Sequence, residues 1–286
     1  MPPADQDPRL PWRAGVLPRS IDLAAGRQPA EFTPGTPAVA AFAVLEVETW
    51  ELQRLLLLTR DGELRRLPAG HLELTHDEGG NAQPLMPANG GLSPDGWTLF
   101  AAQQDAVAVY DLRTGRWREL PAPARTAASA RWLDAATIWV PDAAGAATGS
   151  TWSPDGTKLA ASVRWTPPDL RQAEADEPYG SWVDGPAVAG SYFLAGPVPG
   201  GPVTNPEALI AQTGEATALL ALAQADRGKG CCTVVGWLDE ATLAFLTNGR
   251  VLAWQVGTAR LYRVSELTGL SQDERVAASW AWRTLA

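Results

Sequence analysis

Short runs of alternating hydrophobic and polar residues cover most of the chain, and turn-forming residues separate them. Runs such as 107–112 and 251–256 have the period of two that is typical of β-strands with one buried face. Residues 207–223 are rich in Ala and Leu, as a helix would be, but Thr213 and Gly214 repeat the tip of the other hairpins. We therefore expect strand, turn and strand there too, and an all-β chain throughout.

The turns between these runs fall into two families. In the first, Ser-Pro-Asp-Gly stands between apolar residues at 93–96 and again at 153–156, with degenerate copies at 132–138 and 237–243. Pro presets the first turn position, Asp bonds its own backbone, and Gly accepts the left-handed conformation. In the second family a glycine forms the hairpin tip, as at Gly62, Gly115, Gly214 and Gly257. Both families predict tight antiparallel hairpins.

Two successive hairpins make one four-stranded antiparallel unit, best developed over residues 91–120. The glycine tips recur at intervals that fit blades of about 40 to 50 residues. We therefore predict an all-β fold, a β-propeller of four-stranded antiparallel blades. The repeated units begin near residues 41, 92, 132, 152, 237 and 279. These starts predict about six blades, with five or seven as alternatives.

The repeats resemble those of TolB-like and WD40-like β-propellers. The resemblance rests on the Ser-Pro-Asp-Gly turn, the alternating strand after it and the Asp111-Leu112-Arg113-Thr114-Gly115 hairpin. It is good over 91–120 and 152–163, weaker over 37–67 and 231–266, and absent over 1–36 and 164–190. The WD40 Trp-Asp dipeptide is missing, so the TolB-like kind fits better. The resemblance implies a propeller fold and, usually, a binding role, and it carries over no catalytic residues.

The repeats also divide the chain. We expect residues 1–36, rich in proline, to pack partly on the rim, and residues 37–286 to form the propeller with a loop insertion at 164–190. Residues 16–23 are expected to pair with the strand at 280–285. Large aromatic side chains at one repeat position are expected to fill space between blades; they are Trp132, Trp152, Trp237 and Trp280.

Composition narrows the class of partner. The formal net charge of −9 disfavours a nucleic-acid partner, because phosphate backbones are bound by Lys and Arg. No leader and no apolar run long enough to cross a membrane is visible, so we expect a cytoplasmic protein. The alternative is an extracytoplasmic domain whose leader or anchor is missing. The adjacent Cys231 and Cys232 make no disulfide framework and are expected to be free thiols.

Strand order assigns the connections to two sides of the propeller. The tight turns share one side, so the long connections at 68–90, 165–190 and 224–233 share the other. Long loops on a rigid scaffold often carry binding residues. We therefore expect the second side to be the binding face, and its candidate residues are His71, Glu73, His76, Trp165, Asp169, Tyr179, Trp182, Lys229 and Cys231.

Sequence motifs that would indicate catalysis are weaker than the signals for a binding face. The spacing of His71 and His76 matches no zinc pattern, the nucleophile elbow is absent, and Gly228-Lys229-Gly230 lacks the rest of a phosphate loop. We expect no cofactor or metal, and a non-enzymatic scaffold that binds a protein or small ligand. One alternative is a propeller hydrolase or lyase with a carboxylate or metal site near the central channel. Another is a structural sensor domain detached from a membrane anchor.

Overall fold

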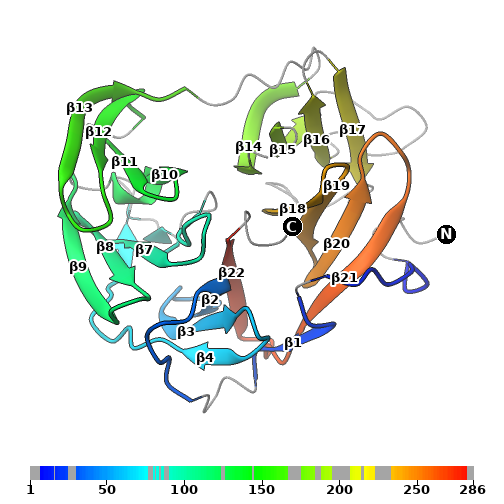
Figure 1. Cartoon of the computed structure of the whole chain (residues 1–286), viewed down its shortest axis with the longest axis horizontal. Coiled ribbons are helices and arrows are strands. Elements are labelled where there is room, and N and C mark those ends of the chain that lie inside the picture. Colours follow the sequence, from blue (N-terminus) through cyan, green and yellow to red (C-terminus); the bar gives the residue numbers. More distant parts are fainter. Residues whose placement is uncertain are drawn as a thin grey trace. The chain divides into compact units, whose positions relative to one another are not determined.

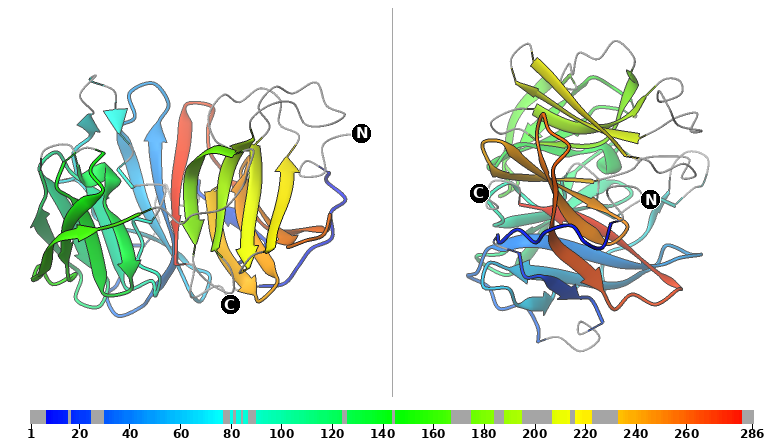
Figure 2. Two further views of the ribbon diagram at one scale, coloured as in Figure 1. Left: turned by 90° about the horizontal axis from the view of Figure 1, so that it is seen from above. Right: turned by 90° about the vertical axis from the view of Figure 1, so that its right-hand side faces the viewer.

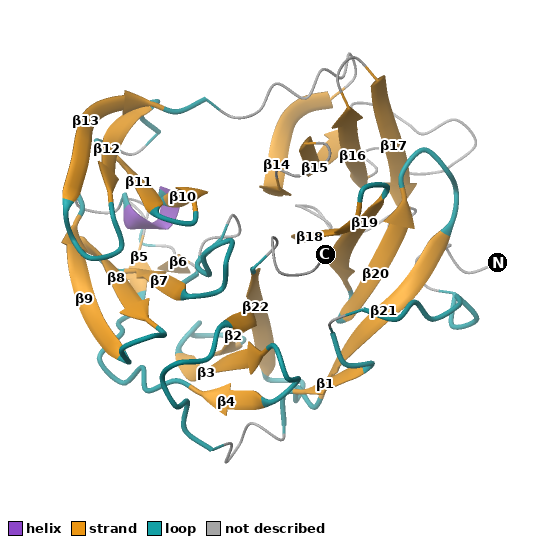
Figure 3. Ribbon diagram, in the orientation of Figure 1, coloured by secondary structure: helices purple, strands orange, loops and turns teal. Residues whose placement is uncertain are grey.

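The computed structural model describes most of the chain between residues 7 and 281, apart from 16, 25–29, 77–79, 81, 84, 87–89, 124–125, 144, 167–174, 184–187, 195–206, 214–215 and 223–232. Strands account for nearly all regular structure (Figure 3). Among these residues the one helical element is a 3-10 turn at Ala127–Ser129, and no helix could span a membrane. The all-β prediction is confirmed.

The chain divides into two compact units, each described separately below. The larger unit consists of Asp22–Thr166 and Thr268–Thr284. The smaller unit consists of Met1–Ile21, Pro167–Leu267 and Leu285–Ala286.

Three antiparallel sheets make up most of the larger unit (Figure 1). The first has the order β22 (Glu274–Trp280), β2 (Ala38–Glu46), β3 (Leu52–Thr59) and β4 (Leu64–Arg66). The second runs β7 (Thr98–Ala102), β8 (Ala106–Asp111) and β9 (Arg116–Pro121), and a bridge from Leu92 to Leu99 begins a further strand. The third runs β10 (Arg131–Asp134), β11 (Thr137–Pro141), β12 (Thr148–Trp152) and β13 (Lys158–Arg164). A small hairpin of β5 (Thr75–His76) and β6 (Ala82–Gln83) lies between the first two in sequence.

Consecutive sheets of this unit pack face to face. Leu45 and Leu55 of the first sheet share a buried cluster with Leu99 of the second. Phe100 and Leu120 of the second sheet share another with Ile138 and Val140 of the third. These side chains are almost fully buried, so the hydrophobic effect holds each sheet against the next. This is how the blades of a β-propeller pack.

The smaller unit contains two sheets. One has the order β14 (Ala175–Val183), β15 (Val188–Leu194), β16 (Glu207–Thr213) and β17 (Ala216–Leu222). The other runs β18 (Thr233–Asp239), β19 (Thr242–Thr247), β20 (Arg250–Gln255) and β21 (Leu261–Thr268), with β1 (Ser20–Asp22) at its outer edge. Strands β14 and β18 bring the two sheets into contact. The hairpin of β16 and β17 confirms the strand–turn–strand prediction for this segment.

The number of blades is smaller than expected. Among the described strands, four sheets reach four or five strands and one has three, against about six predicted blades. The sequence count was too high because Trp132 and Trp152, taken as starts of separate units, lie in β10 and β12 of a single sheet. The starts near residues 41 and 279 also belong to one sheet, since β22 pairs with β2.

The two chain ends join different sheets. In the left view of Figure 2 the red strand β22 stands next to the blue β2, and seven residue pairs from Ala40–Trp280 to Glu46–Glu274 form this ladder. The expected pairing of residues 16–23 with the strand at 280–285 is therefore wrong for the described residues, and residues 16 and 282–285 lie outside them. Instead β1 borders β21, and Trp12 forms a parallel bridge with Arg263. Residues 175–183 and 188–190, which the sequence placed in a loop insertion, lie in strands β14 and β15.

Candidate functional site

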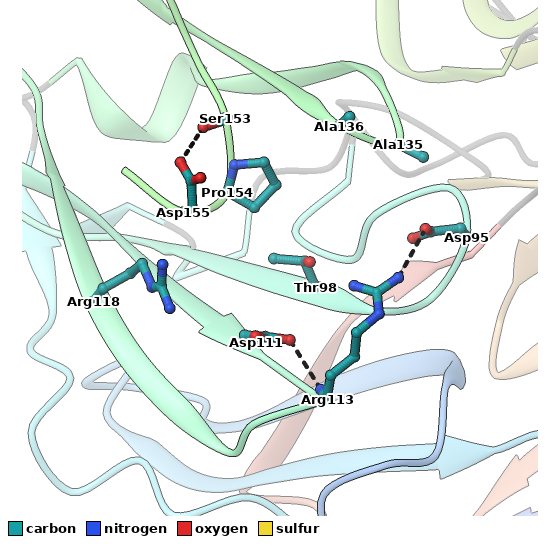
Figure 4. A pocket seen from close by; sticks show the side chains of 10 residues that line it. All are labelled: Asp95, Thr98, Asp111, Arg113, Arg118, Ala135, Ala136, Ser153, Pro154 and Asp155. Atoms are coloured by element: carbon teal, nitrogen blue, oxygen red, sulfur yellow. Dashed lines mark hydrogen bonds and ion pairs between the residues drawn. The ribbon is translucent and has the colours of Figure 1, made fainter. Parts of the chain in front are cut away.

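A polar cavity of about 420 Å³ lies within the larger unit, where turns of the second and third sheets come together (Figure 4). Both copies of the Ser-Pro-Asp-Gly turn contribute to it, one preceding β7 and the other joining β12 to β13. The lining residues are Asp95, Thr98, Asp111, Arg113, Arg118, Ala135, Ala136, Ser153, Pro154 and Asp155. We call this cavity the turn pocket.

The aspartate carboxylates of the two repeated turns accept hydrogen bonds from groups of their own turn. The Asp95 carboxylate accepts hydrogen bonds from the Ser93 hydroxyl at 2.7 Å and the Trp97 N–H at 3.1 Å. In the second turn Asp155 accepts from the Ser153 hydroxyl and from the Thr157 N–H. These hydrogen bonds hold each carboxylate in its own turn. The second oxygen of Asp95 faces the guanidinium of Arg113, and the side chain of Thr157 is a further hydrogen-bond partner of Asp155.

Arg113 stands at the end of the turn pocket that Asp95 also lines (Figure 4). Its guanidinium lies 3.7 Å from the Asp95 carboxylate and 4.6 Å from the centre of the Trp97 ring. Its backbone N–H donates to the Asp111 carboxylate at 2.9 Å. The ion pair and the ring contact both stabilise the positive charge of Arg113.

Arg118 differs from Arg113 because its guanidinium makes no hydrogen bond or ion pair with any described residue. It projects from β9 at the same end of the cavity as Asp155 (Figure 4). Hydrogen bonds from Ser153 and Thr157, together with the nearby charge of Arg118, lower the pKa of Asp155. Asp155 is therefore ionised at neutral pH, and the N–H groups of Arg118, which lines the cavity, have no acceptor among the described residues.

The turn pocket thus presents charges of both signs. A carboxylate or phosphate of a ligand fits the guanidinium of Arg118, which has no hydrogen-bond or ion-pair partner among the described residues, since charge-assisted pairs of this kind are strong and directional. A hydrogen-bond donor or an ammonium group fits the ionised carboxylate of Asp155. Among the described residues no three His, Cys, Asp or Glu side chains are placed to hold a metal ion.

Three of the sequence-predicted site residues follow β4 and are exposed. The ring of His71 meets Trp117 edge to face, with centroids 4.8 Å apart. The backbone N–H of Glu73 donates to the side chain of Gln103 at 3.0 Å. His76 ends strand β5 and pairs with Ala82. The structure gives these three residues separate partners and no shared site.

The remaining predicted residues lie around the expected insertion or beyond it. Trp165 follows β13 and stacks against the guanidinium of Arg131, which stands 3.5 Å from the ring centre. Tyr179 and Trp182 belong to strand β14. Three others lie outside the described residues; they are Asp169, Lys229 and Cys231.

Sequence reasoning missed the residues of the turn pocket. From the sequence, the long connections are expected to form the binding face and the tight turns to have a structural role. The turn pocket lies instead on the side of the tight turns. A usable signal was present, because the same motif places Asp95 and Asp155 in equivalent turns. No sequence pattern indicates that Arg118 lines the cavity without an acceptor among the described residues.

Comparison with known proteins supports no assignment of activity. No protein-family model matches the chain, and no curated protein matches it. Among solved structures, the chain is similar to the AtxE2 isopeptidase in its apo form, with a TM-score of 0.38 and 14% identity over 90% of this chain and 55% of the isopeptidase. It is also similar to the β-propeller domain of the Trilobed protease from Pyrococcus furiosus, with a TM-score of 0.31 and 10% identity over 83% of this chain and 72% of that one. The chain therefore spans about half the length of the isopeptidase.

Proposed function

We propose that this chain is a non-enzymatic β-propeller binding protein of the TolB-like or WD40-like kind, and that the turn pocket is its binding site. The ligand is a small polar molecule that carries an anionic group and a hydrogen-bond donor or cation. The observation that carries the proposal is the guanidinium of Arg118, which lines the cavity with no acceptor among the described residues while Asp155 lines the same end.

The arrangement supports binding in preference to the hydrolase or lyase alternative. Asp95, Asp111 and Asp155 each accept hydrogen bonds from their own turn. A general acid or base must exchange its proton with a substrate at hydrogen-bond distance, and it is usually tuned toward neutral pKa. The pKa of Asp155 is instead lowered, which suits a permanent charge that recognises a ligand.

The proposal is tested by ligand-observed NMR on the whole chain with the twenty free amino acids as probes, because each carries a carboxylate and an ammonium group. We expect at least one probe to bind wild-type protein. Arg118→Gln removes the positive charge and keeps a similar side-chain length, and it should weaken that binding at least tenfold. Thermal unfolding of the variant should match that of wild type.

The matched control is Arg116→Gln, because Arg116 is an exposed arginine on the same strand that does not line the turn pocket. This variant should bind the probe as wild type does. Failure of every probe to bind wild type, or equal loss of binding in both variants, would contradict the proposal.

A further inference from the structure

The side chains that line the turn pocket carry a charge imbalance that narrows the kind of ligand the pocket can take. Asp95 and Arg113 form an ion pair at 3.7 Å, so their charges largely compensate each other. Two more carboxylates and one more guanidinium line the cavity, and they belong to Asp111, Asp155 and Arg118. None of these three groups forms an ion pair with a described residue. Apart from the Asp95–Arg113 pair, the lining therefore holds two negative charges and one positive charge.

The carboxylate of Asp111 is held in place without a cation beside it. One of its oxygens accepts a hydrogen bond from the backbone N–H of Arg113, and the other accepts one from the hydroxyl of Thr114, each at 2.9 Å. Both donors are neutral groups, so they orient the negative charge of Asp111 and do not compensate it. Each carboxylate oxygen has a further lone pair, so Asp111 can also accept a hydrogen bond from a cationic ligand.

A buried hydroxyl lies between the two charged ends of the turn pocket. In Figure 4 Thr98 stands between Arg118 and Asp155 at one end and Asp95 and Arg113 at the other. Thr98 is 3% exposed, and it lines the cavity. Its hydroxyl makes no hydrogen bond with any residue in the described part of the chain. Buried hydroxyls are nearly always hydrogen-bonded, so this one indicates that a polar group enters the cavity.

The remaining lining residues suit an aliphatic chain. Ala135 and Ala136, in the turn between β10 and β11, and Pro154 contribute small or apolar side chains. The volume of about 420 Å³ is at the smaller end of the range of about 300–1,000 Å³ for small-molecule sites. A ligand with charged ends joined by a few methylene groups fits such a cavity.

We infer that the turn pocket takes a free α-amino acid with a cationic side chain, of the arginine or lysine class. This inference rests on the proposed function and names its ligand. The α-carboxylate pairs with Arg118, the α-ammonium pairs with Asp155, and the side-chain cation pairs with Asp111. Such a ligand has two positive charges and one negative charge, which complement the uncompensated charges of the lining. An acidic amino acid would bring a second anion toward Asp111, and a neutral one would leave Asp111 without a cation.

The test compares the affinities of arginine and citrulline for the whole wild-type chain by isothermal titration calorimetry. Citrulline has the same length as arginine and carries a neutral ureido group in place of the guanidinium. Arginine should bind at least tenfold more tightly than citrulline, and glutamate should bind more weakly than either. Nα-acetylarginine lacks the α-ammonium group and should bind at least tenfold more weakly than arginine.

These comparisons need no variant, so they remain informative whatever the effect of substitutions on folding. Equal affinities of arginine and citrulline would overturn the inference and leave the proposed function intact. Undiminished binding of Nα-acetylarginine would overturn it as well. If no amino acid bound the wild-type chain, the proposed function itself would fail.

Variants then locate the side-chain cation. Asp111→Asn removes the negative charge and keeps a residue that suits the same turn, and it should reduce the preference for arginine over citrulline at least fivefold. The matched control is Asp105→Asn, at an exposed position just before β8, which Asp111 ends; Asp105 does not line the pocket, so the preference should stay unchanged. Arg118→Gln should weaken both ligands by a similar factor, because both have the same α-carboxylate. A preference for arginine that persists undiminished in Asp111→Asn would refute the inference.

Discussion

The hydroxyl of Ser279 accepts a hydrogen bond from the backbone N–H of Leu92 at 2.8 Å, in the buried core of the larger unit. Leu92 precedes the first Ser-Pro-Asp-Gly turn, and Ser279 belongs to β22 of the neighbouring sheet. Only a single bridge to Leu99 continues the second sheet at this point. The backbone hydrogen bonds on either side of this bridge, from Phe100 to Gly91 and from Ser93 to Thr98, leave the Leu92 N–H pointing away from β7. A side chain from another sheet therefore satisfies this buried donor.

Ser279→Ala should therefore lower the free energy of unfolding by about 1–3 kcal/mol, because it leaves the buried Leu92 N–H without an acceptor. Chemical denaturation monitored by circular dichroism measures this. Thr166→Ala removes an exposed hydroxyl and should change stability by less than about 0.5 kcal/mol. Equal stability of wild type and Ser279→Ala would show that this hydrogen bond is replaced by another acceptor.

A second prediction concerns the ion pair of Glu274 and Arg54, whose side chains are each 12% exposed and 2.7 Å apart. The hydrogen bond from Arg54, with help from Ser271, lowers the pKa of Glu274 from 4.5 to about 2. The pair therefore stabilises the folded chain fully above the ordinary pKa, and this contribution is lost as the pH falls from 4.5 toward 2.

Glu274→Gln should destabilise the chain by about 1–3 kcal/mol near neutral pH, since it leaves the largely buried Arg54 guanidinium without a negatively charged partner. The difference from wild type should shrink as the pH falls below 4.5. Urea denaturation at a series of pH values tests this. Glu51→Gln, at an exposed position, serves as the control and should show no such pH-dependent difference. A difference that stays constant down to low pH would argue against the ion pair as its cause.

The third prediction compares two glycines with left-handed backbone. Gly62 and Gly96 have φ angles of 84° and 76°. A Cβ would meet nothing within 4 Å at Gly62, but at Gly96 it would stand 2.0 Å from the carbonyl oxygen of Ala38. Gly62→Ala should cost about 1–2 kcal/mol for the left-handed conformation alone. Gly96→Ala should cost a further ~1–3 kcal/mol because the backbone of β2 must move. If Gly62→Ala and Gly96→Ala lost similar thermal stability, β2 would move away from the new Cβ without a measurable cost.

The fourth prediction concerns strand β1. Ile21 is 3% exposed, and Asp22 beside it is exposed. Ile21→Ala should destabilise the chain by about 2–5 kcal/mol if the N-terminal segment is part of the folded core. Asp22→Asn keeps the acceptor for the Ala24 N–H and should stay within about 0.5 kcal/mol of wild type. If Ile21→Ala left the stability unchanged, β1 would lie outside the part of the chain that unfolds cooperatively.

Local features of the fold were predictable because they depend on neighbouring residues. The turn at 93–96, the hairpin of β16 and β17, and the packing of Trp132 against Phe100 of the adjacent sheet, with ring centroids 5.6 Å apart, follow from turn chemistry and period-two patterning. The number of blades was not predictable in this way. The same Ser-Pro-Asp-Gly turn serves any antiparallel pair, so its copy at 153–156 did not reveal that it joins the third and fourth strands of a sheet.

The candidate sites depend on contacts between distant parts of the chain. Asp95 and Asp155 meet around one cavity although 60 positions separate them, and no local pattern encodes that meeting. Trp165 was recognisable as an unusual aromatic residue outside the repeats. Its contact with Arg131 was not, because the sequence does not show which distant side chain stacks on the indole ring.

Because β22 pairs with β2, the first sheet of the larger unit can be completed only after β22 has been made. Residues 38–46 leave the ribosome well before their ladder partner at 274–280. During translation β2 therefore has an open edge, which is a site for wrong pairing or chaperone capture. Forming a contact between segments so far apart in the sequence is also intrinsically slow, so β22 sets the time at which the first sheet becomes complete.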